Sequence, residues 1–141
     1  MASGHGGFEP ERIRHLELLQ AVISRLANEA ALIRGWALTV SAAFFGFAAR
    51  SLSWRIAAVG MLPVVAFWGL NTYYLRAERR YRSLYDRVRS HDASVEPFSM
   101  DASDEKVGST WEVARSSTLL PFYGLIFVVG TILIAAGILK V

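Results

Sequence analysis

The residues best suited to chemistry are six arginines within fourteen positions, with tyrosines interleaved: Arg76, Arg79, Arg80, Arg82, Arg87 and Arg89. Guanidinium groups bind phosphate through paired hydrogen bonds, and tyrosine rings offer stacking faces to bases. This arginine ladder therefore predicts a site for an anionic signal such as a nucleotide or an oligonucleotide. The same residues also suit a plainer role, in which they anchor a membrane helix and contact anionic lipid, worth ~1 kcal/mol per basic group. The sequence leaves both interpretations open.

No other group of residues predicts catalysis. The chain has no cysteine, and its three histidines, His5, His15 and His91, do not have metal-ligand spacing. We therefore expect neither an enzyme nor a metal site, and we expect no cofactor.

The composition is that of a small membrane protein with segregated charge. Its 141 residues suffice for one domain, 53% of them are apolar and 19% are charged. Residues 76–90 carry six arginines against two acids, a net charge of +4, whereas residues 91–117 carry six acids against two bases, a net charge of −4. The acidic segment predicts a loop that balances the ladder or covers it in a resting state.

Three runs without charge predict membrane-spanning helices. Residues 56–75 and 118–139 are long enough, because a helix needs about 20 apolar residues to cross ~30 Å of hydrocarbon. Residues 36–49 are fewer, but Arg34 lies just before them and its long side chain can reach the interface. Gly124, Gly130 and Gly137 within the last run favour close helix packing.

Apolar residues three or four apart continue from the first two spans into the charged flanks. One stripe precedes the first span, with Ala30 and Ile33 as its last members, and the other follows the second span from Leu70 onward. The residues that we expect to pack in a helical stalk or between subunits are Leu16, Leu19, Ile23, Leu26, Tyr74, Ala77, Tyr81, Leu84 and Val88. The alternative is that each stripe belongs to an amphipathic helix on the bilayer surface.

Together these patterns predict an all-α membrane protein, with a long helical hairpin extended into a cytoplasmic stalk and a third transmembrane helix. The expected segments are a flexible N-terminus (1–10), an amphipathic cytoplasmic helix (11–35), spans at 36–49 and 56–75, a basic cytoplasmic helix (76–90), an acidic loop (91–117) and a third span (118–139). Twelve of the fifteen lysines and arginines lie in 1–35 and 76–117, so the N-terminus is predicted inside and the C-terminus outside.

Few polar residues interrupt the spans. Thr39, Ser41 and Asn71 are candidates to line a pore, although each also suits a hydrogen bond between helices. Charged groups are missing from the spans, and this disfavours a proton-coupled transporter.

Four stretches carry a resemblance to a known family: "LQAVISRLANEAALIRGWALTV" (19–40), "FWGLNTYYLRAERRYRSLYDRV" (67–88), "PFSMD" (97–101) and "STLLPFY" (117–123). Through them the chain resembles the SLATT class of small bacterial transmembrane effectors of nucleotide-signalled anti-phage systems. It implies an oligomeric effector that disturbs the bacterial inner membrane when a defence signal changes, and it does not identify that signal. Our hypothesis is a homo-oligomer, with a tetramer favoured, that conducts ions or disrupts the membrane and is gated through its cytoplasmic helices by a nucleotide or oligonucleotide from a partner synthase. The alternative function is a non-conducting membrane anchor or scaffold that recruits a cytoplasmic partner.

Overall fold

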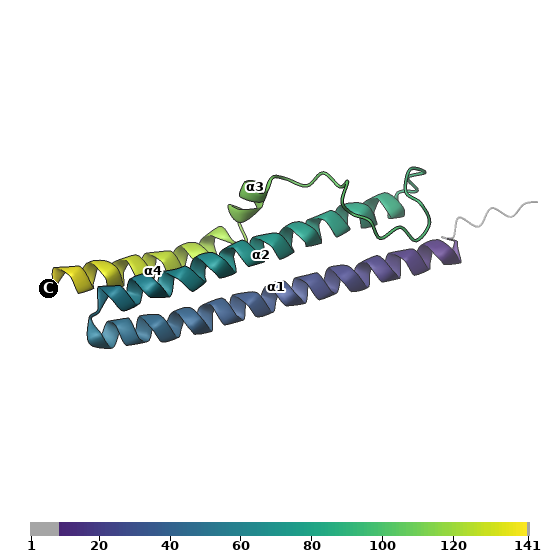
Figure 1. The fold of residues 1–141 in the computed structure, drawn as a ribbon. Helices are drawn as coiled ribbons and strands as arrows, with labels where there is room; N and C mark the ends of the chain where they lie inside the picture. The colour runs from purple at the N-terminus through teal and green to yellow at the C-terminus, as the bar shows by residue number, and fades with distance from the viewer. Residues whose placement is uncertain (1–8, 141) are drawn as a thin grey trace, which may run out of the picture.

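The computed structural model describes residues 9–140 and consists of four helices (Figure 1). They are α1 (Pro10–Ser51), α2 (Trp54–Arg89), the short α3 (Thr110–Ala114) and α4 (Leu120–Leu139). The predicted fold class, an all-α membrane protein with a long hairpin and a third apolar helix, is confirmed. The expected flexible N-terminus falls mostly on residues 1–8, which lie outside the described residues.

A two-residue turn joins α1 and α2. Leu52 takes a left-handed conformation with φ of 47°, and the N–H groups of Leu52 and Ser53 both donate to the carbonyl of Ala48. This arrangement closes the end of α1. The hydroxyl of Ser53 then accepts from the N–H of Ile56 at 3.5 Å and caps the start of α2. The chain thus reverses without a glycine.

The two long helices bury one continuous face each against the other. In α1 this face comprises residues mostly three or four apart over its second half, namely Ala30, Ile33, Ala37, Ser41, Phe45 and Ala48. The helices approach closely near the turn, since a Cβ atom on Gly60 would lie 2.7 Å from the Cβ of Phe44. Small residues on both helices permit this approach, as is typical of helix packing in lipid.

Helix α4 packs mainly on α2, and its C-terminal end lies beside the α1–α2 turn (Figure 1). The shared core holds Phe45, Val64, Leu119, Tyr123 and Ile126, all buried. Two glycines of α4 fit against the hairpin. A Cβ on Gly130 would collide with Met61, and one on Gly137 would lie 2.7 Å from the backbone nitrogen of Trp54.

Three helices, α1, α2 and α4, are long and apolar enough to cross a membrane. Helix α4 has 20 residues, or ~30 Å at 1.5 Å per residue, which matches the hydrocarbon thickness. Helices α1 and α2 have 42 and 36 residues, or ~63 and ~54 Å. The hairpin therefore extends well beyond α4, and we call this extension, residues 11–35 and 76–90, the stalk.

Exchanging a glycine of α4 for valine tests how α4 docks. Gly137→Val forces a side chain into the backbone of Trp54, and we expect it to destabilise the folded protein by ~2 kcal/mol. Gly124→Val is the matched control, because nothing lies within 4 Å of a Cβ there. Thermal unfolding in detergent, followed by tryptophan fluorescence, should show a lower Tm for Gly137→Val alone. Equal melting of both variants would contradict the docking.

Candidate functional site

The stalk has a core of its own, and this core fixes the face of α2 that carries the arginines. Leu19 on α1 packs with Leu84 and Val88 on α2 and with Ala102 from the segment that follows. Leu16, Tyr81, Tyr85, Val95 and Met100 complete the cluster. Two helices alone leave this cluster open on one side, and the segment after α2 covers it.

The residues expected to pack in the stalk occupy two environments. Leu16, Leu19, Tyr81, Leu84 and Val88 belong to the stalk core within one chain. The other members, Ile23, Leu26, Tyr74 and Ala77, are half-buried. Leu70, with which the second stripe begins, is 44% exposed, and Asn71 beside it is buried instead. An ideal helix drifts ~20° per heptad from a strict seven-residue repeat, so the stripe leaves the contact face over its length.

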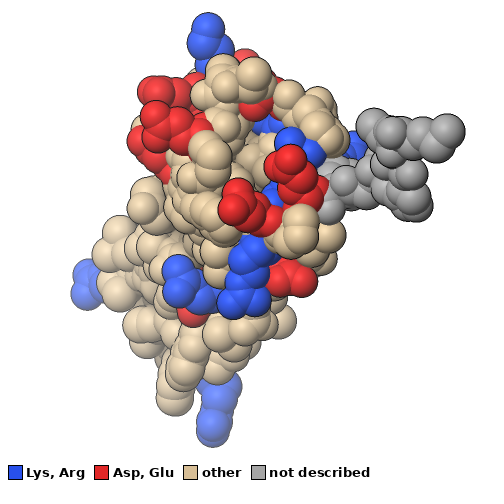
Figure 2. Space-filling view, turned by 90° about the vertical axis from the view of Figure 1, so that its right-hand side faces the viewer, with Lys and Arg blue, Asp and Glu red and all other residues tan. Residues whose placement is uncertain are grey.

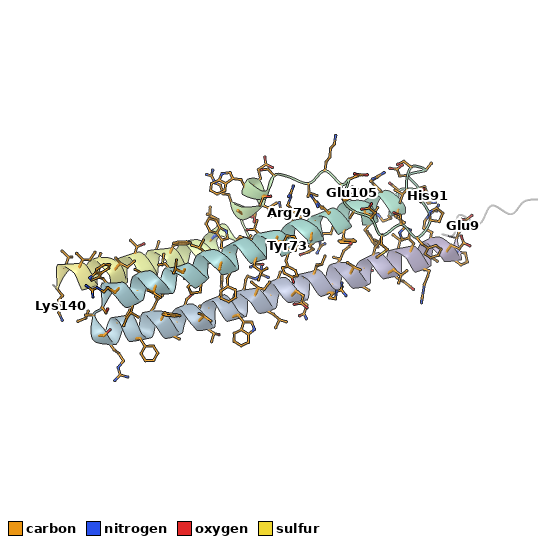
Figure 3. All side chains as sticks on the ribbon, in the orientation of Figure 1. Glu9, Tyr73, Arg79, His91, Glu105 and Lys140 are labelled. Carbon is orange, nitrogen blue, oxygen red and sulfur yellow. The ribbon has the colours of Figure 1, made fainter. Side chains whose placement is uncertain are left out.

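The acidic segment 91–109 returns along α2 and lies over part of the ladder (Figure 3). His91, at φ of 62°, reverses the chain just after α2. Viewed from the tip of the stalk, acidic and basic groups lie side by side instead of forming a uniform basic surface (Figure 2). The predicted loop thus lies against the ladder.

Arg87 is the point where this loop attaches to α2. Its guanidinium donates to Asp92 at 2.9 Å, to the hydroxyl of Ser94 at 2.7 Å and to Glu105. Glu105 is only 8% exposed and also accepts from the hydroxyl of Ser83. One arginine therefore joins the two ends of the loop to the helix.

These contacts keep Asp92 and Arg87 charged. The pKa of the Asp92 carboxyl is lowered well below its usual range, chiefly by the Ser94 hydroxyl and then by Arg87. The pKa of Arg87 is raised, chiefly by its hydrogen bond to Asp92. A carboxyl whose pKa is lowered by folding stabilises the folded state at any pH above its unfolded pKa of about 3.9. This stabilisation is lost only as the pH falls through the lower pKa of the folded state. Asp92 and Arg87 therefore stay ionised at neutral and mildly acidic pH.

Two further arginines pair along α2 itself. Arg82 donates to Glu78 at 2.8 Å, and Glu78 is a buried residue of α2. Arg89 lies 4.0 Å from Asp86 on an exposed surface, where an ion pair contributes little. With Arg87, half of the ladder is neutralised within the chain.

The other half of the ladder, Arg76, Arg79 and Arg80, has no carboxylate partner among residues 9–140. Arg76 and Arg80 line a cavity of about 300 Å³ between α2 and the loop. Its other lining residues are Tyr73, Ala77, Tyr81, Met100, Asp101, Ala102 and Ser103. Arg76 donates from Nη1 to the hydroxyl of Thr110 at 3.0 Å, which leaves its Nε, like the Nε of Arg80, buried and without a partner.

The three pore candidates face different ways. Thr39 is exposed on α1 and donates to the carbonyl of Gly35 at 2.9 Å. Ser41 is buried in the hairpin and donates to the carbonyl of Ala37. Asn71 is also buried and donates to the hydroxyl of Tyr123 at 3.2 Å. Only Thr39 therefore faces away from its own chain.

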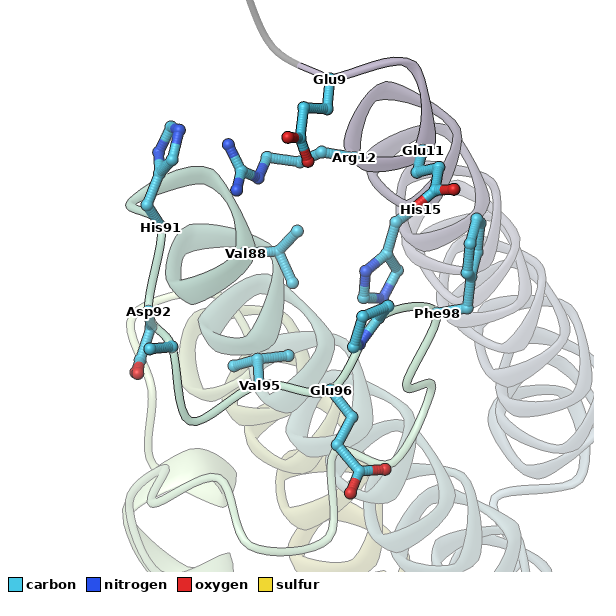
Figure 4. Close-up of a pocket in the computed structure, with 12 residues that line it drawn as sticks. Glu9, Glu11, Arg12, His15, Val88, His91, Asp92, Val95, Glu96 and Phe98 are labelled. Carbon is cyan, nitrogen blue, oxygen red and sulfur yellow. The ribbon is translucent and has the colours of Figure 1, made fainter.

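A second cavity, of about 350 Å³, lies at the tip of the stalk between the first turns of α1 and the loop (Figure 4). Its walls carry both charges, with Glu9 and Arg12 on one side and Asp92 and Glu96 on the other. His15 lies buried beside it, with Nε2 2.7 Å from the carbonyl of Ser99. Among the described residues no group of three or more His, Asp or Glu side chains could hold a metal ion.

Sequence patterns did not reveal several of these contacts. Glu105 and Ala102 lie in a polar stretch without periodicity, so nothing marked them as partners of α2. His15 falls one residue before the predicted stripe, yet it is 4% exposed. The docking of the loop supplies both the partner and the burial.

Comparisons of the chain with protein-family models, with curated proteins and with solved structures found no match in any of the three.

Removing the Glu105 carboxylate tests whether this residue holds the loop on α2. Glu105→Gln loses the ion pair with Arg87, so we expect amide hydrogen exchange in residues 100–107 to accelerate about tenfold. Asp86→Asn is the control, since it removes one acid from an exposed pair on α2. Hydrogen exchange with mass spectrometry measures both variants. An unchanged loop in Glu105→Gln would contradict the assignment.

Proposed function

We propose that the protein is an oligomeric effector of the bacterial inner membrane that opens a conducting path when its stalk senses an anionic nucleotide or oligonucleotide. The observation that carries this proposal is the continuity of α2. The helix is continuous from the arginines of the stalk to the turn at Ser53. Pro63 lies within the helix and does not end it. A ligand held by Arg76 and Arg80 therefore acts on the same rigid element that crosses the membrane.

The proposed orientation has the stalk in the cytoplasm and both the α1–α2 turn and the C-terminus outside. The basic groups of the ladder support it, because lysine and arginine concentrate on the cytoplasmic side of membrane helices. Only Arg50 and Arg55 lie close to the turn in the sequence, and Lys140 lies at the same end of the molecule (Figure 3). The spans then place Tyr73 and Trp36 at the inner interface, where aromatic residues are enriched.

The proposed assembly is a homo-oligomer, with a tetramer favoured, and an exposed face of α1 supports self-association without fixing the number of subunits. Small residues recur along it three or four apart: Ala31, Gly35, Thr39, Ala42, Gly46 and Ala49. Nothing lies within 4 Å of a Cβ built on Gly35 or Gly46, and a groove of about 430 Å³ runs beside the first of them. Small residues allow the backbones of membrane helices to approach closely. In such an assembly Thr39 lies between subunits, where a path would form.

The resemblance to SLATT-type effectors supports the same proposal, including a ligand made by a partner synthase. A second candidate function is a non-conducting anchor or scaffold that recruits a cytoplasmic partner through the stalk. The burial of Ser41 and Asn71 within one chain favours this second function, because it leaves few polar groups to line a path.

Ion flux through the purified protein in liposomes separates the two functions. We expect flux that changes on addition of nucleotide, and we expect Gly35→Leu with Gly46→Leu to reduce it by about tenfold or more by blocking the close approach of α1 helices. Gly69→Leu is the matched control, because Gly69 also has nothing within 4 Å and lies on α2. A protein that inserts and assembles but shows no flux with or without nucleotide would reject the channel in favour of the anchor.

A further inference from the structure

We propose that the cavity between α2 and residues 100–103 binds a phosphate group, carried by a soluble nucleotide or by a lipid headgroup, through the guanidinium groups of Arg76 and Arg80. This site specifies which chemical group of the ligand in the proposed function is bound, namely a phosphate. It rests on that function only for the consequence of binding, because binding itself can be measured without flux.

The first argument is the state of the two guanidinium groups. The Nε atoms of Arg76 and Arg80 are buried and have no hydrogen-bond partner among the described residues. An arginine carries five N–H donors and no acceptor. Each of these two Nε–H groups therefore lacks a hydrogen bond, and a buried donor without a hydrogen bond costs free energy. A phosphate group binds a guanidinium through two parallel hydrogen bonds, and rotation of the two side chains, which line the cavity, brings each covered Nε–H to such an anion.

The second argument is position. Arg76 and Arg80 are four residues apart on one helix, so their side chains leave adjacent turns of the same face. The hydroxyl of Thr110 holds one end of the Arg76 guanidinium at 3.0 Å. Arg76 is thus fixed before a ligand arrives, which lowers the entropy lost on binding.

The third argument is contrast with the rest of the ladder. Arg82, Arg87 and Arg89 each face a carboxylate of the same chain, so an incoming anion must displace that partner. Arg79 has no such partner, but it does not line the cavity. The cavity therefore selects two of the six arginines as the site.

The lining also limits the ligand. A volume of about 300 Å³ is at the lower end for small-molecule sites, so the cavity holds one phosphate group and the rest of a larger ligand lies outside it. Tyr73 is 67% exposed, and its ring offers a stacking face for a base or a contact for a lipid chain. Both sources of phosphate therefore reach the same two arginines.

One residue of the lining opposes an anion. Asp101 accepts from the backbone N–H of Ser103 at 2.9 Å, and its pKa is lowered, chiefly by the Ser103 hydroxyl, so it is charged at neutral pH. No ion pair joins it to Arg76 or Arg80 within the described residues. Two cations against one anion leave the cavity positive, and removal of the Asp101 charge must strengthen anion binding.

Binding of a fluorescent ATP analogue to the full-length protein in phosphatidylcholine nanodiscs tests the site. We expect saturable binding that Arg76→Gln and Arg80→Gln each weaken about tenfold or more, since each removes a charged pair of hydrogen bonds. Arg89→Gln is the matched control, because it removes the same charge outside the cavity and should change the affinity less than about twofold. Asp101→Asn should tighten binding severalfold, and this opposite sign cannot come from a misfolded variant.

A second arm separates the two sources of phosphate. Nanodiscs that also contain phosphatidic acid should leave nucleotide binding unchanged if the soluble ligand is preferred, and should compete with it through Arg80 if the headgroup is. Either result supports a phosphate site. Failure of both ATP and phosphatidic acid to bind, or equal weakening by Arg89→Gln and Arg80→Gln, would overturn it. Binding without flux would reject the channel alone, and flux that responds to ATP in Arg76→Gln and Arg80→Gln would reject this site alone.

Discussion

The packing of α1 against α2 along their whole length is the constraint on which the rest of the structure depends. Its chemistry changes with the surroundings. Near the turn the contact uses small residues such as Ala57 and Gly60, since in lipid close backbone approach replaces the hydrophobic effect. In the stalk it uses Leu19, Leu84 and Val88, whose burial removes apolar surface from water. The same pair of helices thus packs continuously through lipid and through water.

The loop solves two problems that this hairpin creates. Two helices cannot enclose a core in water, and Ala102 and Met100 of the loop complete it. Six arginines on one helix repel each other, and Asp92 and Glu105 neutralise Arg87 among them. Because the loop satisfies only part of the ladder, Arg76 and Arg80 are left beside a cavity at the place where α2 leaves the stalk. Charge balance and the candidate site are therefore two results of the same packing.

The elements of the fold were predictable from the sequence because helix periodicity and uncharged length are local signals. The hairpin, the third apolar helix and the acidic loop follow from residues 11–90, 118–139 and 91–117. The position of the loop was not predictable, because the partners Arg87 and Glu105 are eighteen residues apart and no pattern joins them. The split of the ladder into paired and unpaired arginines depends on that position. The outward face of Thr39 and the inward faces of Ser41 and Asn71 likewise require the observed rotation of each helix, which a stripe of mixed residues leaves undetermined.

The central claim is that α1 is one helix that passes from water into lipid, and site-directed spin labelling measures this most directly. The chain has no cysteine, so single cysteines can be placed along the exposed side of α1, for example at Leu18, Arg25, Leu32 and Phe47. Collisions with a water-soluble nickel complex should be frequent at the first two positions, and collisions with oxygen should dominate at the last, with the change near Arg34. Frequent collisions with the nickel complex at Phe47, or dominant collisions with oxygen at Leu18, would contradict a stalk that continues from a membrane span.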